Sequence, residues 1–355
     1  MDKFKCLIRG AYGASNFGDD ALLDVIYTKL LSKYSEQEIA IWGSNNAYIS
    51  KCYPNSKAIV KKDLYKTRCN SLIYGGGTQF YDFGKARSSK QLWDLLLNPS
   101  YTLNKLKNKL FNKGIKPIEY DKEFYLAVGL GPFLPDSKVK ENVLKRMKIS
   151  NFVSLRDNKS MCFAEEGDVQ AIKTVDICLS KTIAEGKKDN GRIAVVLRDW
   201  EHTHSEYTVE YLFEQVKGLE LSEVDFITFG PDTKLKEFLK ENNLSSFEWD
   251  PYSMTINEFL ETFGNYKMVF SSRYHGVIYS VLLGIPVIAL PIEPKLIQAS
   301  IELNGVILYK PQMGFKHYKN QIENNYDKIS ADLLETKRLK FIESNKTIDT
   351  LLASL

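Results

Sequence analysis

Residues 268–295 are MVFSSRYHGVIYSVLLGIPVIALPIEPK, a segment in which two short apolar runs flank a longer one. The first run is β-branched and aromatic and ends near Ser272, which is typical of a β-strand. The middle run has the length of a helix and ends at Gly284, and glycine is favoured just after helices. The last run, VIAL, has the composition of a buried strand. A strand, a helix and a strand in this order predict a βαβ unit, which belongs to a parallel sheet.

The same alternation extends over the chain and predicts an α/β protein. Strand-like runs lie at Cys6–Ile8, Glu38–Trp42, Ser71–Tyr74, Glu123–Val128, Phe152–Leu155, Arg192–Leu197, Val224–Phe229, Lys267–Phe270 and Pro286–Leu290. Helix-length segments include Asp20–Tyr34, Ser137–Lys148, Tyr207–Lys217 and Thr233–Asn242. The polar stretch at 181–191, KTIAEGKKDNG, separates two sets of strands and has the composition of a linker. We therefore expect two Rossmann-like, doubly wound domains, 1–182 and 190–326, and a helical tail, 327–355, that could pack back on the first domain.

Composition and charge narrow the class of protein. The chain has 355 residues, 26% of them charged, and a formal net charge of +4. This excludes a disordered or fibrous chain, and the charge is too small to indicate nucleic-acid binding, although it suits an enzyme with an anionic substrate. The five cysteines form no CxxC pair, so we expect neither a disulfide framework nor a zinc site. The lack of a secretory signal or an unbroken apolar run of about 20 residues predicts a cytoplasmic protein.

Glycine-rich loops follow two of the strand-like runs in the first half of the chain. The first, RGAYGASNFGDD, contains Gly13 and leads through Asn16 into a helix that opens with Asp19. The second contains three consecutive glycines, Gly75, Gly76 and Gly77. In open parallel sheets ligands bind beyond the carboxyl ends of the strands, where glycines let a ligand approach the backbone. The spacing is not GxGxxG, which excludes the dinucleotide fingerprint, while an ordinary βα turn and a flexible loop tip remain open.

Basic residues also follow strand-like runs. SLRD places Arg156, and VLRD places Arg198, at the carboxyl end of a strand. Lys295 follows the strand of the VIAL run and should face the same cleft. A planar guanidinium can bind a carboxylate or a phosphate with two hydrogen bonds. For each arginine a structural ion pair with the following aspartate is the alternative.

The segment SSRYHG combines the features of an anion site with a titratable group. Ser271 and Ser272 are good helix N-caps, and a helix N-terminus attracts anions. Arg273 adds a fixed cation, and Gly276 would leave room for a ligand. His275 can gain or lose a proton near neutral pH. A histidine satisfied inside the core is the alternative.

Two further features carry weaker signals. His202 and His204 form an HxH pattern, but no third metal ligand accompanies them at a suitable spacing, so a solvated loop is favoured. The stretch 95–118 has no acidic residue and five lysines, Lys105, Lys107, Lys109, Lys113 and Lys116. Leucines recur there at helical spacing, as in a basic amphipathic helix that contacts anionic lipid. A helix with a solvated lysine face is the alternative that we favour.

The strand-end motifs occur in an order that resembles the polysaccharide pyruvyl transferase family. They are NFGDDALL, the triple glycine, VGLGP, SLRD and, above all, SSRYHGVIYSVLLGIPVIAL followed by EPK. Together they extend from about residue 7 to residue 300. The beginning of the pattern is less regular here than is usual for the family, and residues 83–122 match no part of it.

The resemblance implies a GT-B-like architecture, in which two Rossmann-like domains face a cleft. It also implies transfer of the pyruvyl group of phosphoenolpyruvate onto two hydroxyls of a sugar, which forms a ketal and releases phosphate. The expected catalytic residues are His275, Arg273 and Arg156. Further donor-binding residues would be Arg198, Lys295, Ser271, Ser272 and Gly276. The acceptor would lie at Gly13, Asn16, Asp19, Gly75, Gly76 and Gly77.

The partners that we expect are phosphoenolpyruvate and a saccharide, with no metal, no other cofactor and no nucleic acid. The saccharide could be lipid-linked, which would place the enzyme at the inner face of the membrane. The sequence leaves open whether the protein forms a homo-oligomer. One rival function is a nucleotide-sugar-dependent glycosyltransferase of the same architecture, but no acidic residue after RYHG is placed to hold a ribose. A catalytically silent binding protein is the other rival. It is disfavoured because five candidate basic residues occur together.

Overall fold

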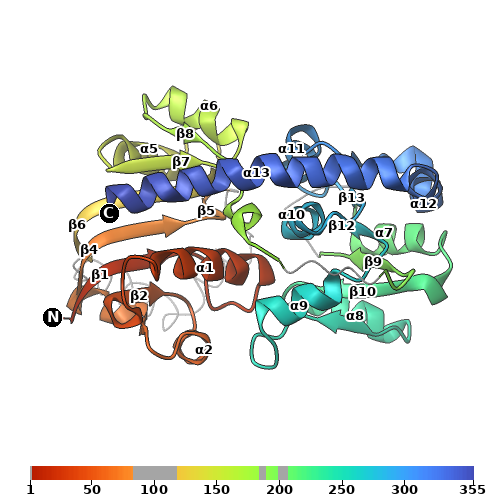
Figure 1. The fold of residues 1–355 in the computed structure, drawn as a ribbon, viewed down its shortest axis with the longest axis horizontal. Coiled ribbons are helices and arrows are strands. Elements are labelled where there is room, and N and C mark those ends of the chain that lie inside the picture. The colour runs from red at the N-terminus through yellow and green to blue at the C-terminus, as the bar shows by residue number, and fades with distance from the viewer. Residues whose placement is uncertain (1, 83–117, 184–188, 199–206) are drawn as a thin grey trace, which may run out of the picture.

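The computed structural model describes residues 2–82, 118–183, 189–198 and 207–355, and these contain two parallel β-sheets (Figure 1). The first sheet has the order β3-β2-β1-β4-β6-β7-β8, with β5 paired to β6 beside it. Its strands are β1 (Asp2–Arg9), β2 (Ile39–Trp42), β3 (Lys57–Ile59), β4 (Thr67–Gly75), β5 (Thr78–Phe80), β6 (Glu119–Leu130), β7 (Phe152–Leu155) and β8 (Ile172–Lys173). Without β5 this is the Rossmann order, extended by one strand.

The second sheet has the order β11-β10-β9-β12-β13-β14, which is again the Rossmann order of 3-2-1-4-5-6. Its strands are β9 (Ile193–Val196), β10 (Val224–Thr228), β11 (Ser246–Glu248), β12 (Met268–Ser271), β13 (Val287–Ala289) and β14 (Val306–Leu308). The register of β12 and β13 pairs Val269 with Val287, and both are completely buried. Helices on both faces explain why β9 and β13, in the middle of the sheet, are apolar at every position.

Helices connect the strands and cover the sheets. In the first domain they are α1 (Phe17–Leu30), α2 (Asn46–Cys52), α5 (Lys138–Lys148) and α6 (Asn158–Glu166). In the second they are α7 (Val209–Val216), α8 (Thr233–Glu241), α9 (Ile256–Phe263), α10 (Tyr274–Leu283), α11 (Pro294–Glu302) and α12 (Gly314–Asn324). Short 3₁₀ helices are η1 (Glu36–Glu38), η2 (Lys61–Lys66), η3 (Ile177–Ser180), η4 (Leu221–Glu223) and η5 (Pro311–Met313). None of the helices in the described ranges is long and apolar enough to cross a membrane.

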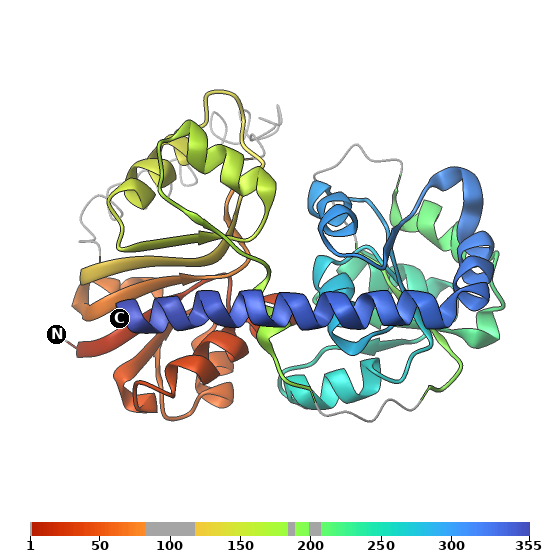
Figure 2. The ribbon, with the colours of Figure 1, turned by 45° about the horizontal axis from the view of Figure 1, so that its top comes forward.

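A last helix, α13 (Tyr326–Ser354), runs across both domains (Figure 2). Its 29 residues give a length of about 43 Å at a rise of about 1.5 Å per residue. In the second domain Thr336 donates a hydrogen bond of 2.9 Å to the carbonyl of Asn304. In the first domain the hydroxyls of Thr347 and Thr174 lie 2.7 Å apart, and both residues are buried. The helix therefore ties the two domains together on one side of the molecule.

A second connection between the domains is the first turn of α1. The sequence predicts this helix at Asp20–Tyr34, but it begins at Phe17, directly after the extended N-cap residue Asn16. The Phe17 ring is completely buried in the second domain, with its centroid 4.9 Å from that of Phe229 and 4.5 Å from that of Phe259. Its backbone N–H donates to the carbonyl of Phe229 at 2.8 Å. One hydrophobic core therefore continues from the first domain into the second.

Two of the weaker sequence signals fall on parts of the chain that the structure leaves out. The lysines from Lys105 to Lys116 and the pair His202 and His204 lie outside the described residues. The basic amphipathic helix and its membrane contact stay predictions.

We predict that Phe17→Ala destabilises the protein by roughly 3–5 kcal/mol, the usual cost of truncating a buried phenylalanine. The midpoint of urea unfolding, followed by circular dichroism, measures the change. Leu31→Ala is the matched control, because Leu31 follows the same helix and is 39% exposed. Equal effects of the two substitutions would contradict the role of Phe17 as the shared core residue.

Candidate functional site

The carboxyl ends of the two sheets face each other, and the expected basic residues gather between them. Arg156 follows β7, and Arg198 follows β9. Arg273 follows β12 as the N-cap residue of α10, and His275 lies in the first turn of that helix. Lys295 lies in the first turn of α11. The parallel sheets therefore bring together residues that are far apart in the sequence.

His275 belongs to the second domain, but its imidazole packs against the first. Its Nε2 lies 3.5 Å from Oδ2 of Asp176, just before η3. Its Nδ1 is so close to Gly18 that a Cβ atom on this glycine would lie 2.1 Å away. Only 14% of the His275 side chain is exposed. Gly18 is thus needed for the close approach of the histidine ring.

Asp176 is the carboxylate partner of His275, and its side chain is completely buried. Burial by itself raises the pKa of this carboxyl group, but His275, Arg156 and the backbone N–H of Cys178 outweigh it and lower the pKa to about 2. The N–H of Cys178 donates to Oδ1 at 3.0 Å. Asp176 is therefore ionised at neutral pH, and its Oδ2 faces the imidazole of His275.

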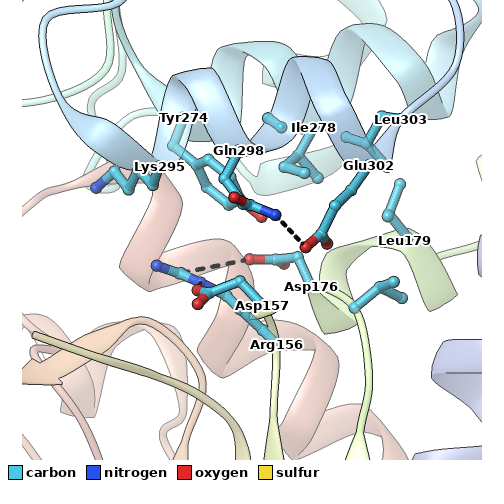
Figure 3. Close-up of a pocket in the computed structure, with 12 residues that line it drawn as sticks. Arg156, Asp157, Asp176, Leu179, Tyr274, Ile278, Lys295, Gln298, Glu302 and Leu303 are labelled. Carbon is cyan, nitrogen blue, oxygen red and sulfur yellow. Dashed lines mark hydrogen bonds and ion pairs between the residues drawn. The ribbon is translucent and has the colours of Figure 1, made fainter. Parts of the chain in front are cut away.

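Arg156 is held in one orientation by neighbours on all sides (Figure 3). Its guanidinium donates a hydrogen bond of 2.8 Å to the Thr78 hydroxyl. It also forms ion pairs with Asp157, at 3.4 Å, and with Asp176, at 3.8 Å. The Tyr274 ring lies over it, 4.7 Å away. Figure 3 shows Tyr274 on the opposite wall, across from Arg156, and Lys295 beside it with its ammonium group turned to the side. The space among these groups is about 20 Å³, room for roughly one water, so a substrate needs side chains or domains to move.

The remaining basic residues of the cleft each have a carboxylate partner in the second domain. Arg273 forms a buried ion pair with Asp232. Arg198 and Lys295 share Glu293, at 3.1 Å and 3.0 Å. Burial lowers the pKa of Lys295, and burial together with the nearby Arg273 lowers that of Arg198 to about 10. Burial is the largest cause of both pKa shifts, and a bound anion would act in the opposite direction.

The structure contradicts the expected N-cap role of the two serines, whereas the donor-binding role of Ser271, Ser272 and Gly276 stays a prediction. Arg273, not a serine, is the N-cap of α10, and no side chain among the described residues forms a capping hydrogen bond there. Ser271 is the last residue of β12, and its hydroxyl accepts from the Arg273 N–H at 3.1 Å and donates to the Arg273 carbonyl at 2.8 Å. Ser272 donates to the carbonyl of Val196 at 3.3 Å. A Cβ atom on Gly276 would lie 2.2 Å from the Ser271 hydroxyl, so this glycine makes room for the serine side chain.

Three of the glycines expected at the acceptor pack closely against other parts of the first domain, and their role at the acceptor stays a prediction. Gly75 and Gly76 touch α1, because a Cβ atom on them would lie 2.2 Å from Ile26 and 2.6 Å from Leu22. Gly13 is buried against the backbone of residues 44–45. Gly77 has a positive φ of 68°, which glycine adopts without strain. The triple glycine thus brings α1 close to the sheet.

Asn16 and Asp19 do face the cleft. The Asn16 amide donates to Asp19 at 2.5 Å. Burial raises the pKa of Asp19, whereas His275, Lys295 and Arg273 act in the opposite direction. An acidic group therefore lies on the first-domain wall of the cleft, opposite the basic residues of the second domain.

Sequence reasoning missed the carboxylates that organise this site, Asp176, Asp232 and Glu293. Each is at least about nine-tenths buried. Asp176 lies in the run TVDICLS, whose only signal was a charged residue among apolar ones. Which basic residue each carboxylate would meet depends on the docking of two domains.

One group in the described ranges has the residue types of a metal site, although the sequence predicts none. It consists of Asp176, Cys178 and His275, whose ligand atoms lie within 4.8 Å of one another. Burial raises the pKa of the Cys178 thiol well above its ordinary value, which disfavours the thiolate that a metal needs. A metal bound there would also occupy the imidazole.

We predict that Gly18→Ala impairs catalysis strongly, because the added methyl group would occupy the position of the His275 ring. Displacement of a reacting group by about 1 Å can cost on the order of a hundredfold in rate. Gly218→Ala is the control, since its Cβ atom would meet only the carbonyl of Gln215, at 3.2 Å. Steady-state rates are compared after thermal unfolding has shown that both variants are folded. Unchanged kinetics in Gly18→Ala would show that the position of His275 does not matter.

The chain was compared with known families and structures. The family model of polysaccharide pyruvyl transferase matches residues 16–294. The comparison with curated proteins finds no match. The match to the crystal structure of TarM covers 82% of this chain and 55% of the TarM chain, with 14% identity. Its TM-score of 0.45 is too low to support an inference.

Two other solved structures are similar over almost the whole chain. Anabaena Alr3699/HepE, solved in complex with UDP, has 12% identity and a TM-score of 0.54, with 100% of both chains covered. S. aureus MnaA, solved with UDP, has 8% identity and a TM-score of 0.57, with 99% of this chain and 96% of that chain covered. At such identities the likeness shows the fold alone, and it confirms the GT-B-like architecture of two Rossmann-like domains. Because the family model extends over most of the chain and includes the SLRD and RYHG motifs, the protein belongs to the polysaccharide pyruvyl transferase family.

Proposed function

We propose that the protein transfers the pyruvyl group of phosphoenolpyruvate to a saccharide as a ketal and releases phosphate. The observation that carries this proposal is the pairing of His275 with the ionised Asp176 in a cleft lined by four cations. Those cations are Arg156, Arg198, Arg273 and Lys295. Membership of the family supports a transfer of this kind to a polysaccharide or its precursor.

The four cations suit a donor that carries both a carboxylate and a phosphate. In the described structure their partners are carboxylates of the protein, such as Glu293 for Lys295. The donor's own carboxylate and phosphate would take over part of these pairings, so binding exchanges one anion for another. Arg156 and Arg273 have planar guanidinium groups that can hold an anion in one orientation, which a lysine cannot do.

The reaction that we propose begins with proton transfer from the imidazolium of His275 to the methylene carbon of phosphoenolpyruvate. A sugar hydroxyl oxygen then bonds to C2, and its proton returns to the imidazole. The bond between C2 and the phosphate oxygen breaks, and its electron pair leaves with the phosphate. A second hydroxyl oxygen of the sugar bonds to C2, and its proton passes to the departing phosphate. Asp176 stabilises the imidazolium, and the cations stabilise the charge on the phosphate.

The rival function, sugar transfer from a nucleotide sugar, uses the same architecture. The similar structures solved with UDP show only that the fold can hold such a ligand. A thermal-shift titration with phosphoenolpyruvate and with a panel of nucleotide sugars separates the two functions. Stabilisation by a nucleotide sugar but not by phosphoenolpyruvate would favour the rival.

We predict that His275→Ala lowers the rate of acceptor-dependent phosphate release from phosphoenolpyruvate by roughly 10²–10⁴-fold, the usual contribution of a general acid. His317→Ala, at an exposed position in α12, is the matched control and should keep the wild-type rate. Phosphate release is measured with the acceptor present and absent. Wild-type turnover in His275→Ala would remove the histidine from the mechanism.

We also predict that Asp176→Asn lowers the rate of acceptor-dependent phosphate release, because the neutral amide loses the negative charge that faces His275 and Arg156. Misplacement of a reacting group by about 1 Å can cost on the order of a hundredfold in rate. Asp168→Asn, at an exposed residue paired with Lys148, should keep the wild-type rate. Wild-type turnover in Asp176→Asn would remove this carboxylate from the mechanism.

A further inference from the structure

A second cavity, of about 360 Å³, lies between the two domains. Its walls come from α1 and α2 of the first domain and from the segment 249–258 of the second, which leads into α9. Figure 1 shows α2 and α9 on the same side of the molecule, away from α13. The volume is within the range of small-molecule sites, about 300–1,000 Å³.

Four aromatic side chains line this cavity, Tyr48, Tyr53, Trp249 and Tyr252. Tyr252 is 44% exposed, whereas Tyr48 and Trp249 are buried. The rings of Tyr48 and Tyr252 meet edge to face, with their centroids 5.9 Å apart. Aromatic residues of this kind offer an apolar face together with a polar group at the ring edge. They suit a ligand with apolar faces and hydroxyl groups at its rim.

Asp20 provides a buried acceptor in this cavity, since the residue is only 2% exposed. Its Oδ2 accepts a hydrogen bond of 2.8 Å from the indole N–H of Trp249. Its Oδ1 is buried and has no hydrogen bond within 3.5 Å from any described residue, although burial raises the pKa of this carboxyl group and the nearby Tyr48 hydroxyl acts to lower it. A buried polar atom without a partner is costly, which points to a donor that is supplied by a ligand.

The charges around the cavity favour a neutral ligand. Burial raises the pKa of Asp20 to about 7, although the Trp249 N–H and the Tyr48 hydroxyl act in the opposite direction, so this carboxyl group is partly protonated near neutral pH. Asp24 forms an ion pair of 2.7 Å with Lys181, and Glu258 accepts from the Thr255 N–H at 2.7 Å. Lys51 donates to the backbone carbonyl of Tyr252. The charged residues that line the cavity are therefore already paired with groups of the protein. Little uncompensated charge remains to bind a phosphate or an amine.

We propose that this cavity is a subsite for a neutral sugar ring, which donates a hydroxyl to Oδ1 of Asp20 and packs on Tyr252. The inference rests on the proposed function, because the sugar would be a further unit of the acceptor. Gly18 and Asp19 face His275, whereas Asp20 faces this cavity, so the first turn of α1 separates the two sites. A sugar in the cavity therefore does not react itself. It selects an acceptor of several units that extends from the reaction site around this turn.

The test measures saccharide binding directly, without the donor, by ligand-observed NMR on the full chain. The probes are neutral tetrasaccharides of glucose, mannose, galactose and N-acetylglucosamine, with uridine diphosphate and choline as non-sugar probes. We expect at least one tetrasaccharide to bind, and Asp20→Asn and Tyr252→Ala each to weaken its binding by roughly tenfold. Loss of a hydrogen bond to a buried carboxyl group accounts for a change of this size.

Asp168→Asn and Tyr120→Ala, both at exposed positions in the first domain, are the matched controls and should bind as the wild type does. Asp20→Asn keeps the shape of the side chain and an oxygen for the Trp249 N–H, so it should stay folded. Binding of no tetrasaccharide, or equal binding by the variants and the wild type, would overturn the proposal. So would binding of uridine diphosphate or choline that is lost in Tyr252→Ala.

Thermal shift with phosphoenolpyruvate separates this inference from the proposed function. If the donor does not bind but a tetrasaccharide binds through Tyr252, the subsite stands and the proposed reaction fails. If phosphate release from phosphoenolpyruvate occurs and Tyr252→Ala leaves the KM of every saccharide acceptor unchanged, the reaction stands and the subsite fails.

Discussion

The first turn of α1 is part of both domains at once. Phe17 lies inside the core of the second domain, and Gly18 lies against the ring of His275. Asp19 faces the basic residues of the cleft, and Asp20 accepts a hydrogen bond from Trp249. Four consecutive residues thus determine how the domains meet, where the histidine lies and how the two cavities are divided. Any opening of the cleft must either withdraw Phe17 from its core or carry α1 along with the second domain.

The cleft holds its cations by pairing each with a carboxylate. A buried ion pair adds little to stability by itself, because both charges lose their hydration, but removal of one partner is costly. Arg273 with Asp232 and Lys295 with Glu293 are therefore ready to exchange one anion for another when a substrate binds. Asp176 differs from these carboxylates because it contacts both Arg156 and His275. It can keep the imidazole oriented while the other pairings change.

The regular part of the fold could be predicted because its signals are local. Continuous apolar runs such as those of β6 and β12 indicate buried strands whatever they pack against. The edge strands β3, β8, β11 and β14 were missed, as was β5, because runs of two or three residues show no periodicity. The early start of α1 was missed because Phe17 is held by contacts with the second domain, more than two hundred positions along the chain.

The sequence by itself determined the alternation of strands and helices, the family and the placing of basic residues at strand ends, since each depends on neighbouring residues. Only the tertiary structure decided what those residues contact. In the folded protein Gly276 packs against the Ser271 hydroxyl, and Gly75 packs against α1. Asp176 of the first domain contacts His275 of the second. These contacts join segments that are distant in sequence, and they form only when two domains dock around a shared core. Local propensity carries no information about that docking, whereas burial and charge pairing depend on it entirely.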